Sequence, residues 1–541
     1  FSGMGVGQNV SGAGDFNGDG YEDFLVAAPN ASGGAGKVYL FFGEVDGLDN
    51  DALVFDDSYF DGNVGVVFQG NYANEHLGTD VAGIGDFNGD GYDDIVLGFR
   101  GTNIFGAYLL YGAASLPGGG KVIMSPDTVG DMGFGKPVGG VRIHGVAAGT
   151  NALCSVSGIG DFCLNGFDGF VIGIGEGSGS DGGNSAYLIF GTSNGLGSNG
   201  DLALSTASLQ PPSGLVVKGT EPGVNFGAAV AGLGDINGDG ASDVALGAPL
   251  TTLNAVNGVG RTVVLLGHAD YGQSNLCPKS VDLSRLLTAG AGADGTDMLA
   301  ALTTEIPTFD QHLRELYLPA MSQPGNVVQG KVLGFTIDGA DASGNAGALV
   351  AGAGDFNGDG VGDVAIGASG INGGQGGIAV LFGSAALPAS VSFSDIGGAR
   401  EGLLLSGTPA MSGAFSLAPG GDLNGDGFSD VLVGAPGGNP EFFTGAGMTY
   451  VVFGGDTIGG VYALQDLNTV VGLEGLCVYN TGLDERNTTS YAVTQGFGVS
   501  CSAVGDVNMD GICDFIAGET DGATIVFGQR EDTTATYQCI L

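Results

Sequence analysis

The sequence predicts an all-β protein, a seven-bladed β-propeller with four strands in each blade. A nine-residue phrase rich in Asp, Asn and Gly recurs seven times along the 541 residues, and each copy lies between two short apolar strands. A third apolar strand and a fourth, more polar one follow before the next copy. Because one blade cannot bury both of its faces alone, we expect residues 1–541 to form a single closed ring without exposed sheet edges.

The strands are predicted from apolar runs between glycines. Each phrase follows a short strand that ends in Gly and precedes a run that is apolar throughout, such as 24–26 or 95–97. Unbroken hydrophobicity predicts a strand that is buried on both faces. A third strand closes on Gly, as in 37–43 and 449–454, and 65–70 is an example of the fourth.

The recurring phrase keeps oxygen-bearing side chains at positions 1, 3, 5 and 9 in six copies, which start at residues 15, 86, 235, 355, 422 and 506. The remaining copy, residues 161–169, keeps the frame but has lost the oxygens at positions 3 and 9, where Cys163 and Gly169 stand. We therefore expect six equivalent loops and one degenerate loop, each between strands 1 and 2 of its blade.

This spacing is typical of a calcium loop. Side-chain oxygens at positions 1, 3, 5 and 9 and a backbone carbonyl at position 7 can converge on one hard cation, and Gly at positions 4 and 6 allows the turns. Only the last complete copy departs, with Met509 at position 4. Three carboxylates and an amide suit Ca²⁺ better than Mg²⁺, which demands a tighter octahedron. A set of Asx and Gly turns without metal is the alternative.

We expect about six Ca²⁺ ions, with the ninth Asp as closing ligand because apolar residues or Ala stand at position 12. The predicted ligand residues are Asp15, Asn17, Asp19, Tyr21, Asp23, Asp86, Asn88, Asp90, Tyr92, Asp94, Asp235, Asn237, Asp239, Ala241, Asp243, Asp355, Asn357, Asp359, Val361, Asp363, Asp422, Asn424, Asp426, Phe428, Asp430, Asp506, Asn508, Asp510, Ile512 and Asp514.

The motifs together resemble the FG-GAP repeat of the integrin α-subunit N-terminal β-propeller. The phrase Gly-Asp-Phe-Asn-Gly-Asp-Gly, with Ile236 or Leu423 in place of Phe in blades 4 and 6, is followed there by Gly-Ala-Pro at 247–249 and 434–436, and Phe-Gly stands upstream at 226–227 and 497–498. The resemblance spans essentially the whole chain. It implies a seven-bladed propeller, extracellular calcium in the loop between strands 1 and 2, and interaction rather than catalysis. Blade 2 departs, with Gly-Phe-Arg at 98–100, and no integrin-type inserted domain is present, so only the scaffold and its calcium loops carry over.

The charge of the chain excludes several partners. With 58 acidic and 14 basic residues the formal charge is −44, and the resulting field repels nucleic acid, anionic membranes and anionic polysaccharides.

No apolar run reaches the ~18–20 residues that cross a bilayer, and the sequence begins at Phe1 without a leader segment. We expect a processed, extracellular or cell-surface protein with no transmembrane segment.

The sequence favours a non-catalytic role. Its four His are scattered without metal spacing, and Ser193 lies in a nucleophile-elbow pattern that enters a Gly-rich turn instead of a helix. We expect a cell-surface or matrix adhesion or structural subunit that binds protein partners or itself. The alternative is an extracellular carbohydrate-binding protein or hydrolase on the same scaffold, since 15 Tyr and 30 Phe supply surfaces for stacking on sugars.

Two local disulfides are expected from the seven cysteines. Cys501 precedes the last loop and Cys513 lies within it, so this pair would span neighbouring strands at the loop mouth. Cys154 and Cys163 bracket the degenerate loop in the same way. There a covalent bond would replace the missing calcium.

The two ends of the chain predict how the ring closes. Blade 1 is complete within residues 1–70, and blade 7 obtains its last strands from 523–528 and 534–541, so no strand exchange is needed. Such a seam is expected to be weaker than an exchanged one. Cys539 would bond either to Cys477, leaving Cys277 unpaired, or to another subunit. We expect the exposed rim near the C-terminus and the insertion in blade 4 to contact neighbouring copies, and hence a homopolymer.

Two further features stand outside the repeat. N-glycosylation sequons begin at Asn9, Asn30 and Asn487, all predicted on the face opposite the calcium loops. Residues 288–328 form an insertion in blade 4, within which apolar residues recur at helical spacing until Pro319. We expect a partly helical segment that folds onto blade 4, or a docking element for a partner.

Overall fold

The computed structural model describes most of the chain. The described residues are 3–43, 55–60, 62–101, 104–114, 120–124, 129–130, 138–146, 153–175, 184–196, 200–204, 213–219, 223–253, 255–267, 280–282, 334–339, 341–388, 390–407, 416–438, 446–470, 472–479, 496–530 and 539–540. The predicted insertion at 288–328 lies outside these residues.

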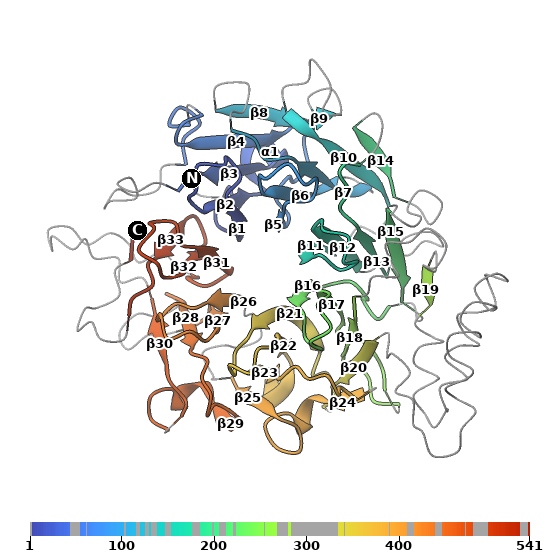
Figure 1. Ribbon diagram of the computed structural model, residues 1–541, viewed down its shortest axis with the longest axis vertical. Coiled ribbons are helices and arrows are strands. Elements are labelled where there is room, and N and C mark those ends of the chain that lie inside the picture. The colour runs from blue at the N-terminus through green and yellow to red at the C-terminus, as the bar shows by residue number, and fades with distance from the viewer. Residues whose placement is uncertain are drawn as a thin grey trace, which may run out of the picture.

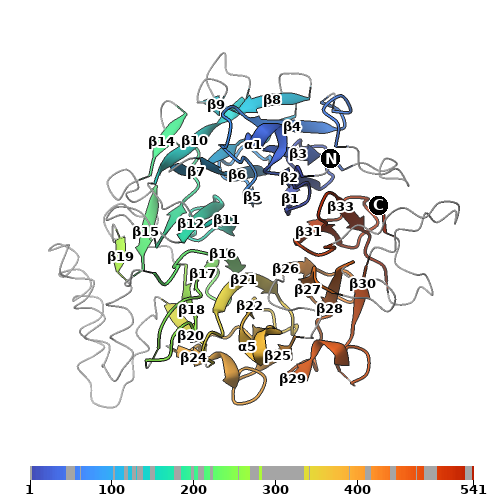
Figure 2. The ribbon, with the colours of Figure 1, turned by 180° about the vertical axis from the view of Figure 1, so that it is seen from behind.

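The fold is an all-β propeller of seven sheets arranged in a ring, as the sequence predicts (Figure 1). The first strand of each sheet lies nearest the ring axis, and the later strands follow outward. Figure 2 shows the same ring from behind. The four antiparallel strands of each blade are, in order, β1 (Asn9–Gly14), β2 (Asp23–Ala28), β3 (Lys37–Phe41) and β4 (Gly65–Gly70); β5 (Val81–Gly85), β6 (Asp94–Gly101), β7 (Ile104–Leu110) and β10 (Val138–Val146); β11 (Leu153–Gly160), β12 (Gly169–Gly175), β13 (Ser185–Ile189) and β15 (Gly214–Lys218); β16 (Val230–Gly234), β17 (Asp243–Ala248), β18 (Arg261–Leu265) and β20 (Gly334–Asp338); β21 (Ala346–Gly354), β22 (Asp363–Ala368), β23 (Gly377–Leu381) and β25 (Gly402–Ser406); β26 (Ser416–Gly421), β27 (Asp430–Ala435), β28 (Met448–Val452) and β30 (Gly475–Val478); β31 (Cys501–Gly505), β32 (Asp514–Gly518), β33 (Ala523–Val526) and β34 (Cys539–Ile540).

Five blades carry an additional outer strand that the sequence analysis did not predict. In each case the connection between the third and fourth strands of one blade pairs, in parallel, with the fourth strand of the preceding blade. Successive blades are therefore joined along their outer edges as well as at their faces. These strands are β8 (Lys121–Met124), β14 (Asp201–Ala203), β19 (Ser280–Asp282), β24 (Ser390–Ser392) and β29 (Gly460–Ala463).

The remaining elements are short. Strand β9 (Val129–Gly130) pairs with β10. Single helical turns, α1 (Ala31–Gly34) and α5 (Ile371–Gly374), connect the second and third strands of blades 1 and 5. Two 3₁₀ turns follow β24 and β29, at Phe393–Asp395 and Leu464–Asp466. Within the described residues, no helix is long and apolar enough to span a membrane.

The core lies between blades. Seven clusters of buried apolar residues occupy the seven blade interfaces, and the second strands, such as β2 and β27, are buried along their whole length. This is the burial that the unbroken apolar runs predict. The seventh cluster joins blade 1 to blade 7, because Val10 and Phe24 pack with Val504 and Ile516. The ring thus closes face to face, without strand exchange, as expected.

Candidate functional site

The loops between the first and second strands share one backbone design. In all seven, the backbone N–H of position 6 donates to Oδ2 of the Asp at position 1, at 2.7–2.9 Å. Glycines provide the left-handed turns, for example Gly18 with φ +75° and Gly20 with φ +95°. In the last loop Met509 adopts the same region, with φ +56°. The phrase therefore forms a tight loop of defined shape.

Positions 3 and 5 lie next to each other in this loop, and the Asp at position 5 is exposed in all six complete copies. In blade 1, Nδ2 of Asn17 donates to Oδ2 of Asp19 at 2.8 Å, and the backbone N–H of Tyr21 donates to Oδ1 of Asp19 at 3.0 Å. The Asn-to-Asp bond recurs in blades 2, 5, 6 and 7. Four oxygen-bearing side chains of each complete loop are thus within nine residues, with positions 1, 3 and 5 gathered around its turn.

The Asp at position 9 is buried beneath the loop. In blade 1, Oδ2 of Asp23 accepts the backbone N–H of Phe16 at 3.1 Å, and Oδ1 accepts that of Gly43, directly after β3, at 3.0 Å. The other five complete loops have the same pair of bonds, at 2.7–3.1 Å from the position 2 N–H and at 2.7–3.0 Å from the Gly N–H after the third strand. This carboxylate therefore fastens the loop to the third strand of its own blade.

Burial shapes the electrostatics of position 9. It raises the pKa of Asp23, Asp94 and Asp430 to about 8, and nearby loop carboxylates act in the same direction, whereas the backbone N–H donors lower it. The equivalent pKa values in blades 4, 5 and 7 rise to about 7 for the same reason. A proton or a nearby cation would relieve the cost of burying this charge.

The donor set of the loops fits a hard cation. Carboxylate, amide and carbonyl oxygens are the ligands that Ca²⁺ takes in proteins. In blade 5, Oδ1 of Asp355 is buried and has no hydrogen-bond partner, and a bound cation would satisfy such an oxygen. In the part of the chain that the structure describes, no three His, Cys, Asp or Glu side chains converge in a metal-binding arrangement. The reason lies in the loop design: an Asn occupies position 3, and the ninth Asp faces backbone amides below the loop.

The degenerate loop of blade 3 keeps its shape without these donors. Asp161 still accepts the backbone N–H groups of Asn165 and Gly166, both at 2.8 Å. Since Gly169 replaces the ninth Asp, the fastening to the third strand is made instead by Nδ2 of Asn165, which donates to the carbonyl of Gly191 at 3.1 Å. Loop shape and ligand set are therefore separable in this protein.

Sequence reasoning missed the residues at position 8. Asp93 and Asp168 each reach the loop of the preceding blade, where their carboxylates accept the backbone N–H of Asp15 at 2.8 Å and of Asp86 at 3.1 Å. The signal in the sequence is an acidic residue at position 8 in blades 1 to 3 only, beginning with Glu22. The loops are therefore in contact with one another around the ring.

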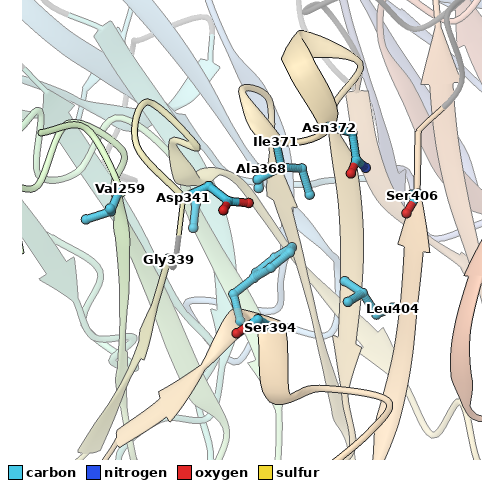
Figure 3. Close-up of a pocket in the computed structure, with 11 residues that line it drawn as sticks. Val259, Gly339, Asp341, Ala368, Ile371, Asn372, Ser394, Leu404 and Ser406 are labelled. Carbon is cyan, nitrogen blue, oxygen red and sulfur yellow. The ribbon is translucent and has the colours of Figure 1, made fainter. Parts of the chain in front are cut away.

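Between blades 4 and 5 lies a pocket of about 120 Å³ (Figure 3). Its floor is apolar and includes the buried Val259, Ala368 and Phe393. Polar groups approach from separate elements, as Figure 3 shows for the carboxylate of Asp341 and the amide of Asn372. Among the described residues that line it, Asp341 is the one with a carboxylate.

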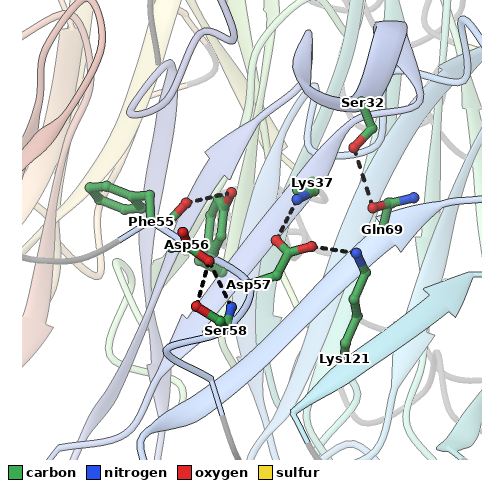
Figure 4. Close-up of polar contacts among 9 residues, drawn as sticks. Ser32, Lys37, Phe55, Asp56, Asp57, Ser58, Gln69 and Lys121 are labelled. Carbon is green, nitrogen blue, oxygen red and sulfur yellow. Dashed lines mark hydrogen bonds and ion pairs between the residues drawn. The ribbon is translucent and has the colours of Figure 1, made fainter.

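Several of the 14 basic residues are held in internal ion pairs. The carboxylate of Asp57 lies between the ammonium groups of Lys37 and Lys121, so that this bridge fastens β8 to blade 1 (Figure 4). Arg261 pairs with Asp338 across β18 and β20. These ion pairs join neighbouring strands, and the chain as a whole carries 58 acidic residues against 14 basic ones.

Both predicted local disulfides are wrong in this structure, because Cys154, Cys501 and Cys513 are free thiols. Cys501 lies opposite Ala517, at the end of its strand remote from the loop, whereas Cys513 precedes the residue opposite Gly505. Four residues of strand separate the two positions by roughly 13 Å, too far for an S–S bond.

The other predicted cysteine pairs are also not formed among the described residues. Cys154 is likewise opposite Ile174, remote from the degenerate loop. Cys477 is a free thiol whose Sγ lies 3.7 Å from Sδ of Met448, so no bond to Cys539 forms. Cys277 lies outside the described residues.

The sequons differ in accessibility. Nδ2 of Asn9 donates to the carbonyls of Gly78 and Thr79, at 3.2 and 2.8 Å, and is thus held between blades 1 and 2. Asn30 is exposed in the connection after β2, on the face opposite the loops as predicted. Asn487 lies outside the described residues.

Fold and loops together define a repeat protein of the β-propeller class. The model of the FG-GAP repeat matches residues 6–41 in blade 1 and 413–452 in blade 6. The predicted FG-GAP repeats are thereby confirmed in these two blades. The structure gives the motif a physical reason, because a Cβ on Gly434, the first residue of Gly-Ala-Pro, would lie 2.1 Å from the carbonyl oxygen of Gly498 in the next blade. Gly-Ala-Pro and Phe-Gly thus meet across the blade interface.

Proposed function

We propose that this chain is an extracellular, non-catalytic interaction scaffold whose propeller is stabilised by calcium in six of its seven loops. One observation carries the proposal: the same oxygen-rich phrase recurs in six blades with one backbone design, at one end of the ring. FG-GAP repeats are typical of extracellular or surface proteins, and this supports the location.

In each complete loop, the side chains at positions 1, 3 and 5 and the carbonyl at position 7 would hold the ion, and the ninth Asp would close the site. Calcium would supply the positive charge that the clustered carboxylates lack. The chain itself contributes the preformed turn, through the position 6 N–H on the first Asp and through the glycines at positions 4 and 6.

The interaction role rests on the surface that the propeller presents. The chain carries a formal charge of −44, and several of its basic residues form ion pairs within the protein. Basic protein surfaces are therefore the complementary partners. A cell-surface or matrix adhesion or structural subunit that binds a basic protein surface agrees with this charge, whereas a homopolymer would have to overcome the repulsion between its acidic copies. An N-glycan at Asn30 would lie on the face opposite the loops, away from them.

Calorimetric titration of the chelator-treated protein with calcium tests the proposal. We expect about six ions per chain with affinities of ~10⁻⁴–10⁻³ M, the range of extracellular modules. Asp19→Asn should remove one ion, and Asp161→Asn in the degenerate loop is the matched control that should remove none. Absence of calcium binding by the wild-type chain would refute the proposal.

The alternative is a carbohydrate-binding protein or hydrolase on the same scaffold. The pocket between blades 4 and 5 is the feature to examine, since it combines an apolar floor with Asp341 and Asn372. Hydrolysis of a glycoside ordinarily needs two carboxyl groups, and the described lining of this pocket includes one. Binding of the protein to a glycan array, with loss of binding in Asp341→Asn, would favour this alternative.

A further inference from the structure

Neighbouring loops are connected by a repeated backbone hydrogen bond. The N–H of position 8 donates to the carbonyl of position 1 in the loop of the preceding blade, at 2.8–3.3 Å. The bond recurs at six of the seven blade interfaces, so the first residue of each of these loops is fixed from outside its own blade. The pairs are Asp93 with Asp15, Asp168 with Asp86, Ser242 with Asp161, Gly362 with Asp235, Ser429 with Asp355, and Cys513 with Asp422.

Two of these contacts are reinforced by a carboxylate. Oδ2 of Asp168 accepts the backbone N–H of Asp86 at 3.1 Å, and Oδ2 of Asp93 accepts that of Asp15 at 2.8 Å. At these interfaces the peptide groups on both sides of the position 1 Asp are therefore held by one residue of the next blade. Hydrogen bonds to an ionised acceptor are stronger than neutral ones.

Packing adds to the same contact. The ring of Phe167, at position 7 of the degenerate loop, lies so close to Gly89 that a Cβ there would be 2.5 Å from it. Tyr92 approaches Gly18 in the same way, at 2.3 Å. The position 4 glycine thus serves a second purpose besides its positive φ, since it leaves room for the aromatic ring of the following loop.

The degenerate loop of blade 3 keeps its contacts with the loop of blade 2 although it has lost ligand positions of its own. It has lost the oxygens of positions 3 and 9 but keeps both residues, Phe167 and Asp168, that touch the loop of blade 2. We propose that blade 3 retains this loop as a metal-independent support, in which Asp168 is a positioning residue that orients Asp86 for calcium in blade 2. This inference rests on the proposed calcium function and adds a residue outside any ligand set.

The contact with Asp168 would fix the backbone of Asp86 before calcium binds. A calcium ligand binds more tightly when its backbone is already fixed in the bound geometry, because less conformational entropy is lost. Residues that orient a metal ligand from behind typically change affinity by about 10–100-fold when they are replaced. Removing the Asp168 carboxylate should therefore weaken the blade 2 site and leave the blade 1 site unaffected.

Terbium luminescence can resolve the two sites. Tyrosine stands at position 7 in blades 1 and 2 alone, so bound Tb³⁺ next to Tyr21 or Tyr92 is excited through the ring. An Asp19→Asn background, which removes the blade 1 ion, reports blade 2, and an Asp90→Asn background, which removes the blade 2 ion, reports blade 1. We expect Asp168→Ala to lower Tb³⁺ affinity about tenfold in the first background and not in the second, and Asp93→Ala to lower it in the second. Asp168→Asn, which keeps an acceptor oxygen without the charge, should have an intermediate effect.

A second readout does not depend on metal. Hydrogen exchange of the Asp86 backbone amide in calcium-free protein should become at least tenfold faster in Asp168→Ala, because its acceptor is gone. Unchanged blade 2 affinity together with unchanged Asp86 exchange would overturn the inference. If the wild-type chain binds neither Tb³⁺ nor Ca²⁺, the proposed function fails, whereas the exchange experiment still decides whether Asp168 holds Asp86.

Discussion

The hydroxyl of Ser500 donates a hydrogen bond of 2.9 Å to the carbonyl oxygen of Gly7, across the interface at which the ring closes. The same contact occurs between blades 6 and 7, where Ser416 donates to Gly498 at 3.0 Å. A further bond joins the backbone N–H of Gly3 to Asp521 at 3.2 Å. The closing interface is therefore built like an internal one, although residues nearly 500 positions apart form it.

Replacing Gly518 should disrupt this closing interface. An added Cβ would lie 2.0 Å from the carbonyl oxygen of Gly7, so Gly518→Ala forces the two blades apart and should lower the free energy of unfolding by about 1–3 kcal/mol. Ser500→Ala should cost about 1 kcal/mol, the value of one hydrogen bond. The control is Gly522→Ala, whose Cβ meets no atom within 4 Å. Urea denaturation with equal midpoints for all three variants would contradict this account of closure.

The ninth Asp should matter for stability even without calcium. Asp94→Ala leaves the buried backbone N–H of Gly112 without its acceptor, at a cost of about 1–3 kcal/mol, and leaves that of Phe87 with the carbonyl of Gly85 alone. Asp90→Ala, at the solvent side of the same loop, should cost much less in chelator. Thermal unfolding in chelator measures both. Equal melting temperatures for the two variants would show that position 9 has no fastening role.

Asp80 gives the protein a pH-dependent interface between blades 2 and 3. Its carboxylate accepts the backbone N–H of Val156 at 2.8 Å, and burial, the largest cause, raises its pKa from 3.8 to about 6. The folded state thus holds this proton more tightly than the unfolded state does. Its stabilising contribution is complete below about pH 4 and is lost as pH rises through about 6.

Asp80→Asn should remove that component of the pH dependence. Denaturation midpoints of the wild type and variant, measured from pH 4 to pH 7, should diverge in favour of the variant as pH rises. The facing titratable group is Cys154, whose pKa burial raises to about 12, so it stays neutral throughout. Parallel midpoints across the range would contradict the prediction.

Cys154 and Cys501 should behave as free thiols. Burial raises the pKa of Cys501 to about 11 and that of Cys154 to about 12, so neither forms a reactive thiolate near neutral pH. Iodoacetamide should leave both unmodified in the folded protein and label both after unfolding without reductant. Peptides joined by Cys501–Cys513 or Cys154–Cys163 bonds would contradict the structure.

The sequence was sufficient for the fold because each blade repeats the same signals. The run 24–26 predicts a strand buried on both faces, and Asp23–Ala28 is buried throughout. The outer strands could not be predicted in this way, since Lys121–Met124 is short and partly exposed, and its partner, β4, belongs to the preceding blade. The disulfide predictions failed because spacing along the chain does not reveal which end of a strand a residue occupies.

For the candidate site, the sequence predicted the loops but not which carboxylates in them are exposed and which are buried. The phrase alone does not distinguish Asp19, at the solvent side, from Asp23, which is buried against Gly43. Nor does it show that Asp168 contacts the loop of blade 2, because that contact depends on the packing of whole blades. These are relationships between repeats, which no single repeat encodes.

The stability of the protein as a function of free calcium tests the central claim most directly. With site affinities of ~10⁻⁴–10⁻³ M, 10 mM calcium should stabilise the folded state by about 1.4–2.7 kcal/mol for each occupied loop. Differential scanning calorimetry, with bound calcium counted by equilibrium dialysis, should show a melting temperature that rises with calcium and saturates at about six ions per chain. A melting temperature that is the same in 10 mM calcium and in chelator, with no bound ion, would contradict the account.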